Sequence, residues 1–176
     1  MSGRSHDPKF DKSKRNRKVH ELAACGLFVA VALIFSYVES LLPIPFPVPG
    51  MRLGFANIAV LSVLYLYGAR DAFLVNLVRI VLASLLFGNV QSFFFSLAGG
   101  MASLGIMALL KRVDKFSVIG VSAVGGIVHN IAQIVIAVLV LSTPAIAYLL
   151  PVFIGLGVAT GVMCGVVSRL FLRHVG

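Results

Sequence analysis

The chain has 176 residues, of which 59% are hydrophobic and 12% are charged, and its mean hydropathy is +1.02. Soluble domains contain only about 45 to 50% apolar residues, so this composition excludes an ordinary soluble enzyme and indicates an integral membrane protein. The net charge of +9 would suit a nucleic-acid-binding protein, but the basic residues are distributed between apolar segments. We therefore expect no nucleic acid partner.

Six apolar segments are long enough to cross the hydrocarbon core of a bilayer, which takes about 20 residues, or fewer where the bundle is thin. The sequence therefore predicts an all-α integral membrane protein: a basic N-terminal arm (1–20) and a bundle of six transmembrane helices (21–176). No segment remains for a separate soluble domain. The six segments lie at about Leu22 to Leu42, Arg52 to Tyr67, Ala72 to Phe87, Ser92 to Leu110, Val118 to Leu141 and Pro151 to Leu172.

The distribution of basic residues predicts the orientation of the bundle. Of the fifteen Lys and Arg residues, all except Arg52 and Arg79 lie in the arm, at Arg70, in the loop 111–115 or in the tail 169–173. With six spans these four segments share one side of the membrane, and the positive-inside rule makes that side cytoplasmic. We expect a multi-pass protein of the cell membrane with both termini in the cytoplasm, and an arm that is disordered or lies along the anionic inner leaflet.

The first span carries Gly26 and Ala30, a pair of small residues whose spacing lets two helices approach closely. The pair either packs inside the bundle or docks another subunit. Glu39 lies one turn from the outer end of this span. The following segment, 43–50, has proline at every second position, which excludes a helix and favours an extended path. This connector either shortens a loop or acts as a lid over an outward-facing cavity.

Arg79 lies in the middle of the third span, where insertion scales assign roughly 2.5 to 3.5 kcal/mol to a charged side chain. Asn76 lies three residues earlier and shares its helix face, so this face must point into the bundle. A buried residue, a water-filled cavity or a ligand must compensate the charge. Glu39 is the candidate internal partner, and an Arg79–Glu39 pair would leave nothing to bind.

The fifth span carries a polar stripe. Gly126, His129, Asn130 and Gln133 follow one another at i, i+3, i+4 and i+7, which places them on one helix face. A lone histidine is more often a structural residue than a ligand. Three polar side chains above a glycine favour a functional face.

Other features of the spans indicate packing. Phe93 to Phe95 point in different directions, so we expect them to pack rather than to line one site. The sixth span carries Gly157, Gly161 and Gly165 at four-residue spacing, which is a double GxxxG packing ridge. The sequence leaves open whether this ridge packs internally or dimerises.

With helices alternating in direction, the polar side chains collect in the outer and middle parts of the membrane. The simplest geometry is a pocket that is open to, or capped from, the outside and closed on the cytoplasmic side by packed small residues. A guanidinium offers planar paired donors that suit a carboxylate or a phosphate. We expect a substrate-binding site lined by Arg79, Asn57, Asn76, His129, Asn130 and Gln133, with Glu39, Arg52, Asn89 and Gln91 toward its mouth.

The sequence argues against catalysis by this chain alone. Prenyl diphosphate synthesis uses clustered aspartates to hold Mg²⁺, and Asp7, Asp11, Asp71 and Asp114 form no pair inside the bundle. No P-loop is present, so ATP hydrolysis must come from a partner. His129 is the only histidine inside the bundle, which argues against haem held by two helix histidines. We expect no enzyme activity, no cofactor and no metal site.

Three blocks of the sequence resemble the Gx transporter family, also catalogued as heptaprenyl diphosphate synthase component I: Arg52–Ile58, Leu85–Gly100 and Gly120–Gln133. The resemblance covers about residues 22–172. That family is grouped with the S-components of energy-coupling factor (ECF) transporters, which are six-helix subunits that capture vitamins or related cofactors and work with a T-component and two ATPases. The resemblance implies a membrane-embedded, substrate-binding subunit that captures a small anionic or cofactor-like molecule from the outside.

By the same resemblance, Gly26 and Ala30 match the small-residue motif that docks on the T-component, although Ala-xxx-Ala is its usual form. Similar proteins also suggest an alternative role. The chain would then be a non-catalytic membrane component of heptaprenyl diphosphate or menaquinone synthesis, or of flavin-based extracytosolic electron transfer, with a prenyl synthase or a redox protein as its partner.

Overall fold

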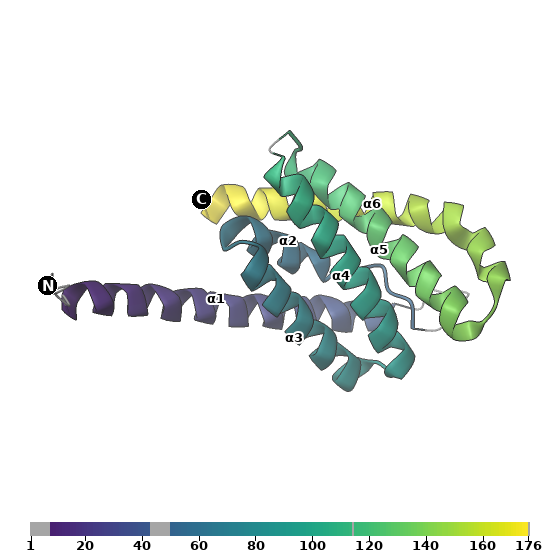
Figure 1. Ribbon diagram of the computed structural model, residues 1–176, viewed down its shortest axis with the longest axis horizontal. Helices are drawn as coiled ribbons and strands as arrows, with labels where there is room; N and C mark the ends of the chain where they lie inside the picture. The colour runs from purple at the N-terminus through teal and green to yellow at the C-terminus, as the bar shows by residue number, and fades with distance from the viewer. Residues whose placement is uncertain (1–7, 43–49, 114, 176) are drawn as a thin grey trace, which may run out of the picture.

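The computed structural model describes residues 8–42, 50–113 and 115–175, with side chains from Lys18 onward in the first range. Within these ranges the chain is all-helical and forms no strand, as the composition predicts. The elements are α1 (Pro8–Leu41), α2 (Asn57–Leu66), α3 (Ala69–Phe87), α4 (Val90–Arg112), α5 (Val118–Leu141), the 3₁₀ helix η1 (Pro144–Leu149) and α6 (Leu150–Val175). Figure 1 shows them as one bundle of helices, with the N- and C-terminal ends of the chain on the same side.

Four helical segments in the described ranges are long and apolar enough to cross a membrane: Lys18–Leu41, Val90–Arg112, Val118–Leu141 and Pro144–Val175. The chain is thus a multi-pass membrane protein. α2 is only 10 residues long, and the 19 residues of α3 include Arg70, Asp71 and Arg79. The expectation that these two helices also span the bilayer stays a prediction.

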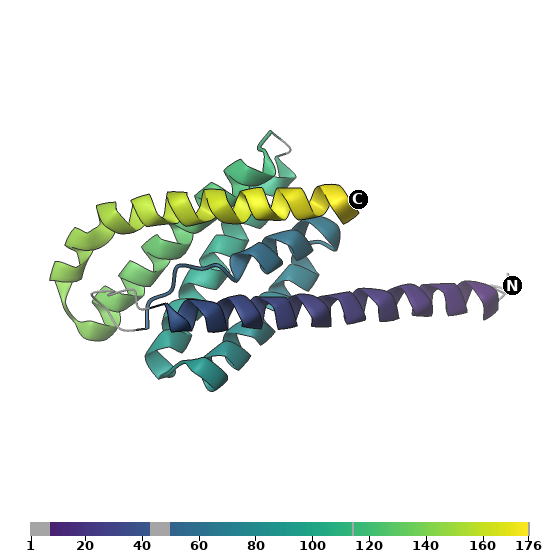
Figure 2. The same cartoon turned by 180° about the vertical axis from the view of Figure 1, so that it is seen from behind.

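The first helix is longer than the sequence suggested. α1 has 34 residues and projects well beyond the rest of the bundle at its N-terminal end, in both Figure 1 and Figure 2. Residues 8–20 form its first turns, so of the two expectations for the arm, disorder does not hold there. Lys and Arg are good helix formers, and a helix already nucleated by an apolar span extends through them at little cost.

The second helix starts later than predicted. We expected it to begin at Arg52, but α2 begins at Asn57, and residues 50–56 are irregular. Gly50 and Gly54 have φ angles of +93° and +90°, which other residues rarely adopt and which no helix contains. This non-helical stretch, here called the inner segment (residues 50–56), brings Arg52 into the bundle. The proposed lid role of 43–50 rests on residues 43–49, which lie outside the described ranges.

The GxxxG ridge of α6 packs internally, against α5. A Cβ atom added at Gly157 would lie 2.7 Å from the Gly126 carbonyl oxygen, and one at Gly161 would lie 2.6 Å from that of Ser122. At Gly165 it would lie 2.8 Å from Ile119 Cα. The two helix backbones therefore touch at three successive glycines, which resolves the alternatives of internal packing and dimerisation in favour of the first.

The aromatic run at the start of α4 behaves as expected for packing. Phe95 is fully buried, whereas Phe94 is 48% exposed, because neighbouring helical side chains point in different directions. Phe95 belongs to a small core shared with α5 and α6.

The largest apolar core lies in the half of the bundle nearest the loop 113–117. It joins the C-terminal part of α2, the first turns of α3 and α5 and the last turns of α4, and so closes that half to water. Polar side chains gather in the opposite half. The residues of this core are Val60, Leu61, Val63, Leu64, Ala72, Val75, Leu104, Met107 and Val121.

Candidate functional site

Arg79 on α3 is the centre of the buried polar residues, and its side chain is only 3% exposed. Its Nε and Nη2 atoms both donate to Oδ1 of Asn76, at 3.0 and 2.8 Å. Nη2 also donates to Oδ1 of Asn57 at 3.3 Å, while the Asn76 amide nitrogen donates to the Gly100 carbonyl at 3.0 Å. The spacing of Asn76 and Arg79 correctly predicted a shared inward face.

The guanidinium is held by neutral oxygens. Among the described residues, no salt bridge joins Arg79 to Glu39, whose Oε1 instead accepts from the Gly54 backbone nitrogen at 2.9 Å. The internal Arg79–Glu39 pair is therefore not formed as a direct contact. The bonds of the guanidinium run from its Nε and Nη2 atoms to Asn76 and Asn57.

Gln133 and Glu39 hold the inner segment from two sides. Oε1 of Gln133 accepts from the Arg52 nitrogen at 2.9 Å and its Nε2 donates to the Arg52 carbonyl at 2.8 Å. With the Glu39–Gly54 bond, these contacts give hydrogen-bond partners to both backbone groups of Arg52 and to the nitrogen of Gly54. Irregular backbone at membrane depth is tolerated only where protein satisfies its polar groups. Both side chains thus position Arg52, whose Nε donates to Ser92 Oγ at 3.1 Å.

His129 and Asn130 on α5 face the same buried region. A Cβ atom at Gly54 would lie 3.2 Å from the His129 Nε2, and one at Gly99 would lie 2.9 Å from its Nδ1. Neither ring nitrogen forms a hydrogen bond within the described residues. The Asn130 amide nitrogen donates to the Phe153 carbonyl at 2.8 Å, but its Oδ1 has no partner there. Buried polar atoms without partners are costly and call for an explanation, such as a bound molecule.

Two predicted residues lie outside this cluster. Asn89 is exposed and caps α4, since its Oδ1 accepts from the Ser92 nitrogen at 2.8 Å. Gln91 is half-buried in the first turn of the same helix. The cluster, here called the polar cluster, comprises Glu39, Arg52, Asn57, Asn76, Arg79, Ser92, His129, Asn130 and Gln133.

Sequence reasoning missed Ser92 and the glycines that line the cluster. Gly100 lies against the guanidinium, where a Cβ atom would come within 3.2 Å of Arg79 Nη2, and Gly88 lies equally close to Arg52, at 3.3 Å from its Nη2. In the sequence, the Gly99–Gly100 pair indicated a place where another helix could pack closely. Nothing local indicated that an arginine and a histidine from two other helices would occupy that space.

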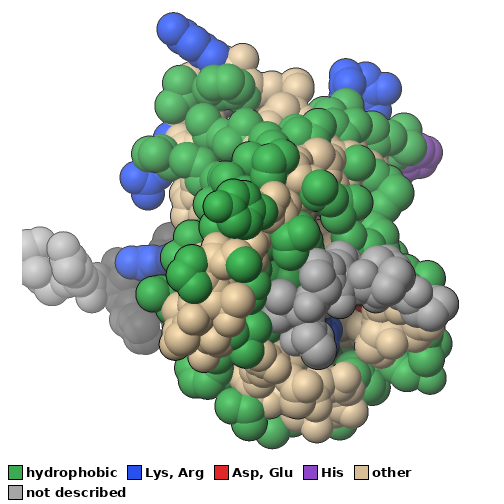
Figure 3. All heavy atoms as spheres, turned by 90° about the vertical axis from the view of Figure 1, so that its right-hand side faces the viewer, with side chains coloured by type: hydrophobic (Ala, Val, Ile, Leu, Met, Phe, Trp, Pro, Cys, Tyr) green, Lys and Arg blue, Asp and Glu red, His purple; other side chains and the backbone are tan. Residues whose placement is uncertain are grey.

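The polar cluster approaches the surface at the end of the bundle away from the main apolar core. Exposure falls from 9% at Arg52 and 8% at Glu39 to 3% at Arg79. Figure 3 views the molecule from the side of the α5–α6 connection, and small areas of basic and acidic atoms are visible in the middle of a mostly apolar and uncharged face. No group of three His, Cys, Asp or Glu side chains suited to a metal ion occurs in the described ranges.

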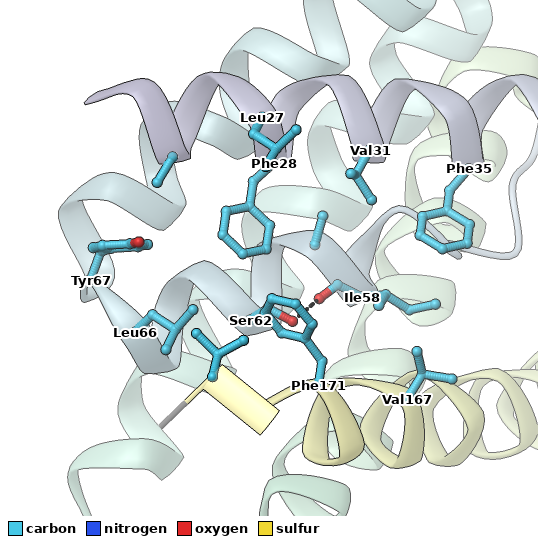
Figure 4. A pocket seen from close by; sticks show the side chains of 13 residues that line it. Leu27, Phe28, Val31, Phe35, Ile58, Ser62, Leu66, Tyr67, Val167 and Phe171 are labelled. Carbon is cyan, nitrogen blue, oxygen red and sulfur yellow. Dashed lines mark hydrogen bonds between the residues drawn. The ribbon is translucent and has the colours of Figure 1, made fainter. Parts of the chain in front are cut away.

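A groove of about 370 Å³ lies elsewhere, between α1, α2 and α6 (Figure 4). Phe28, Phe35 and Phe171 line it with other apolar side chains. Two lining side chains carry a hydroxyl, Ser62 and Tyr67, and that of Ser62 donates to the Ile58 carbonyl at 2.8 Å. The lining of this groove suits hydrocarbon rather than a polar molecule.

The small-residue pair of α1 does not pack inside the chain. Gly26 and Ala30 are exposed, and a Cβ atom at Gly26 would have no neighbour within 4 Å. Of the two uses considered for this pair, internal packing is excluded within the described residues. Docking to another subunit stays a prediction.

Comparison with known families adds to this geometry. The sequence pattern described as heptaprenyl diphosphate synthase component I matches residues 28–171. The chain belongs to this family. A solved S component of a bacterial ECF transporter is similar to this family member in structure, with a TM-score of 0.70 and 20% sequence identity over 90% of this chain and 96% of that one. At that identity the likeness establishes a shared fold. No curated protein matches the sequence.

Proposed function

We propose that this chain is a membrane-embedded substrate-binding subunit that captures a small anionic molecule from the outside, in the manner of an ECF S component. The observation that carries the proposal is the buried Arg79 guanidinium, held by the neutral oxygens of Asn76 and Asn57. A charge so placed costs several kcal/mol unless a counter-charge reaches it. An anionic ligand would supply that charge, and no catalytic motif accompanies the site.

The geometry around Arg79 supports recognition by several donors at once. The guanidinium groups of Arg79 and Arg52 can donate, and so can one nitrogen of a neutral His129 ring, because neither ring nitrogen has a partner in the described residues. Arg52 lies nearer the surface than Arg79. Charge-assisted donors of this kind bind carboxylates and phosphates with defined geometry. Gly54, Gly99 and Gly100 let the His129 and Arg79 side chains pack closely against the backbone, because a side chain at these positions would strike His129 or Arg79.

The test is to purify the protein in detergent and identify retained small molecules by mass spectrometry. Wild-type protein should retain an anionic compound, and Arg79→Gln should abolish retention while the bundle still folds. Arg70→Gln, which removes an exposed arginine from the start of the same helix, is the matched control and should behave as wild type. Equal retention by Arg79→Gln and wild type would refute the proposal.

As an S-component-like subunit, the chain would couple to a T-component and ATPase subunits through α1. The exposed Gly26 and Ala30 support this partner, because they leave one face of α1 open to close helix packing. Gly26→Leu should weaken co-purification with such subunits and leave ligand retention unchanged.

The family description favours a second candidate, a non-catalytic membrane component of heptaprenyl diphosphate synthesis. In that role the protein would co-purify with a soluble prenyl synthase, and its function would not depend on ATPase subunits. Proteomic analysis of the purified complex separates the two candidates, since each requires a different class of partner.

A further inference from the structure

Three buried charged side chains meet in the polar cluster: Glu39, Arg52 and Arg79. Their formal charges sum to +1 when Glu39 is ionised and His129 is neutral. Glu39 is within electrostatic range of both arginines, and the two arginines are within range of each other. None of the three forms a salt bridge among the described residues, so each charge acts on the whole site rather than on one partner.

The net charge of these three side chains matters because they are buried inside an apolar bundle. In a medium of low dielectric, charges interact far more strongly than in water, and a net buried charge is expensive. A ligand that brings the site to neutrality is favoured over one that leaves a residual charge of either sign. The site therefore discriminates between ligands by their charge as well as by their shape.

We propose that Glu39 is a specificity-determining residue that restricts the ligand to a single negative charge, by offsetting one of the two arginines. The inference rests on the proposed function and refines it: the ligand class is the monoanions, such as a monocarboxylate or a phosphodiester, rather than dicarboxylates or diphosphates. Without Glu39 the two guanidinium groups would favour a dianion.

Glu39 also has a structural role, since its Oε1 accepts from the Gly54 nitrogen at 2.9 Å. Glu39→Gln separates the two roles. The amide oxygen of glutamine can accept the same hydrogen bond in nearly the same volume, while the charge of the site rises to +2. A merely structural Glu39 would give a variant with unchanged ligand preference.

The experiment uses hexanoate and adipate as probes, because they have the same chain length and carry one and two negative charges. Affinities are measured at neutral pH from the rise in unfolding temperature with probe concentration. Wild-type protein should bind hexanoate more tightly than adipate by at least about tenfold, which is 1.4 kcal/mol. Glu39→Gln should shift this ratio toward adipate by at least about tenfold.

Glu21→Gln is the control, because it removes a carboxylate from α1 five turns away from Glu39. It should keep the wild-type ratio. An unchanged ratio in Glu39→Gln, a wild-type preference for adipate, or the absence of binding of either probe to wild type would each overturn the inference.

Failure of the inference is distinguishable from failure of the proposed function. If the molecule retained by wild type depends on Arg79 but carries two negative charges, the proposed function stands and the inference that Glu39 selects monoanions fails. If retention does not depend on Arg79, the proposed site itself is wrong.

Discussion

The side-chain amide of Gln133 forms two hydrogen bonds with the backbone of Arg52, one at 2.9 Å from the Arg52 nitrogen and one at 2.8 Å to its carbonyl oxygen. The two residues are 81 positions apart and both are buried. The glutamine amide supplies the backbone hydrogen bonds that a neighbouring strand or helical turn supplies elsewhere. It thereby fixes the depth at which Arg52 enters the bundle.

Gln133→Ala should therefore destabilise the protein, because it leaves a buried N–H and a buried C=O without partners and opens a void. Each unpaired group costs about 1 to 3 kcal/mol, so the unfolding temperature in detergent should fall by several degrees. Val135→Ala, a truncation at an exposed site on the same helix, is the control and should have a small effect. Equal unfolding temperatures for the two variants would contradict this role of Gln133.

The glycines of α4 provide a matched pair. A Cβ atom at Gly99 would lie 2.9 Å from the His129 ring and 3.0 Å from its carbonyl oxygen, whereas one at Gly105 would meet nothing within 4 Å. Gly99→Ala should cost about 1 to 3 kcal/mol through overpacking and reduce ligand retention. Gly105→Ala should be neutral or stabilising, because alanine favours the helix. Thermal unfolding and mass spectrometry of both variants test this, and a Gly99→Ala protein indistinguishable from Gly105→Ala would refute it.

A second matched pair tests the contact between α5 and α6. At Gly157 a Cβ atom would lie 2.7 to 2.9 Å from backbone atoms of Gly126 and Ile127, which cannot move aside as a flexible side chain can. Gly157→Ala should force the helices apart and lower the unfolding temperature. At Gly155, two residues earlier on α6, a Cβ atom has no neighbour within 4 Å. Gly155→Ala should leave the unfolding temperature unchanged, and an equal loss in both variants would argue against close helix contact.

Sequence patterns predicted those features that depend on helical spacing. The shared face of Asn76 and Arg79, and the burial of His129, Asn130 and Gln133, both follow from the 3.6-residue period. The high hydrophobic content likewise predicted an all-helical membrane protein. Periodicity is sufficient for these features because neighbours on one helix face are set by local geometry.

The inner segment was not predictable in this way. Residues 52–56 were predicted to start an apolar helix, but the backbone of Arg52 bonds to Gln133 and the nitrogen of Gly54 bonds to Glu39, neither of which is a helical neighbour. Contacts of that range leave no local pattern. For the same reason Glu39 and Gln133 were identified as buried polar residues, yet their bonds to backbone groups were not anticipated. The cap that Asn89 forms on α4 was likewise not anticipated, because a helix cap and a site residue use the same kind of side chain.

The predicted orientation can be tested with single cysteines at two exposed loop positions. Lys115 lies between α4 and α5, and Thr143 follows α5. Because α5 is long and apolar enough to cross the membrane, Lys115→Cys and Thr143→Cys should lie on opposite sides. With Cys25→Ser and Cys164→Ser as background, a membrane-impermeant maleimide should label Thr143→Cys in intact cells and Lys115→Cys only after lysis. The reverse order of labelling would place the basic loop outside.

Asn57→Asp tests whether the bound molecule interacts with the charge of Arg79. Asn57 Oδ1 accepts from Arg79 Nη2 at 3.3 Å, so an aspartate of the same size would place a carboxylate beside the guanidinium. This internal carboxylate should compete with the ligand and weaken retention by at least about tenfold, while the charge-assisted bond keeps or raises the unfolding temperature. Asn89→Asp adds the same charge at the exposed cap of α4, so it should leave retention unchanged. Wild-type retention by Asn57→Asp would mean that the bound molecule does not use the Arg79 charge.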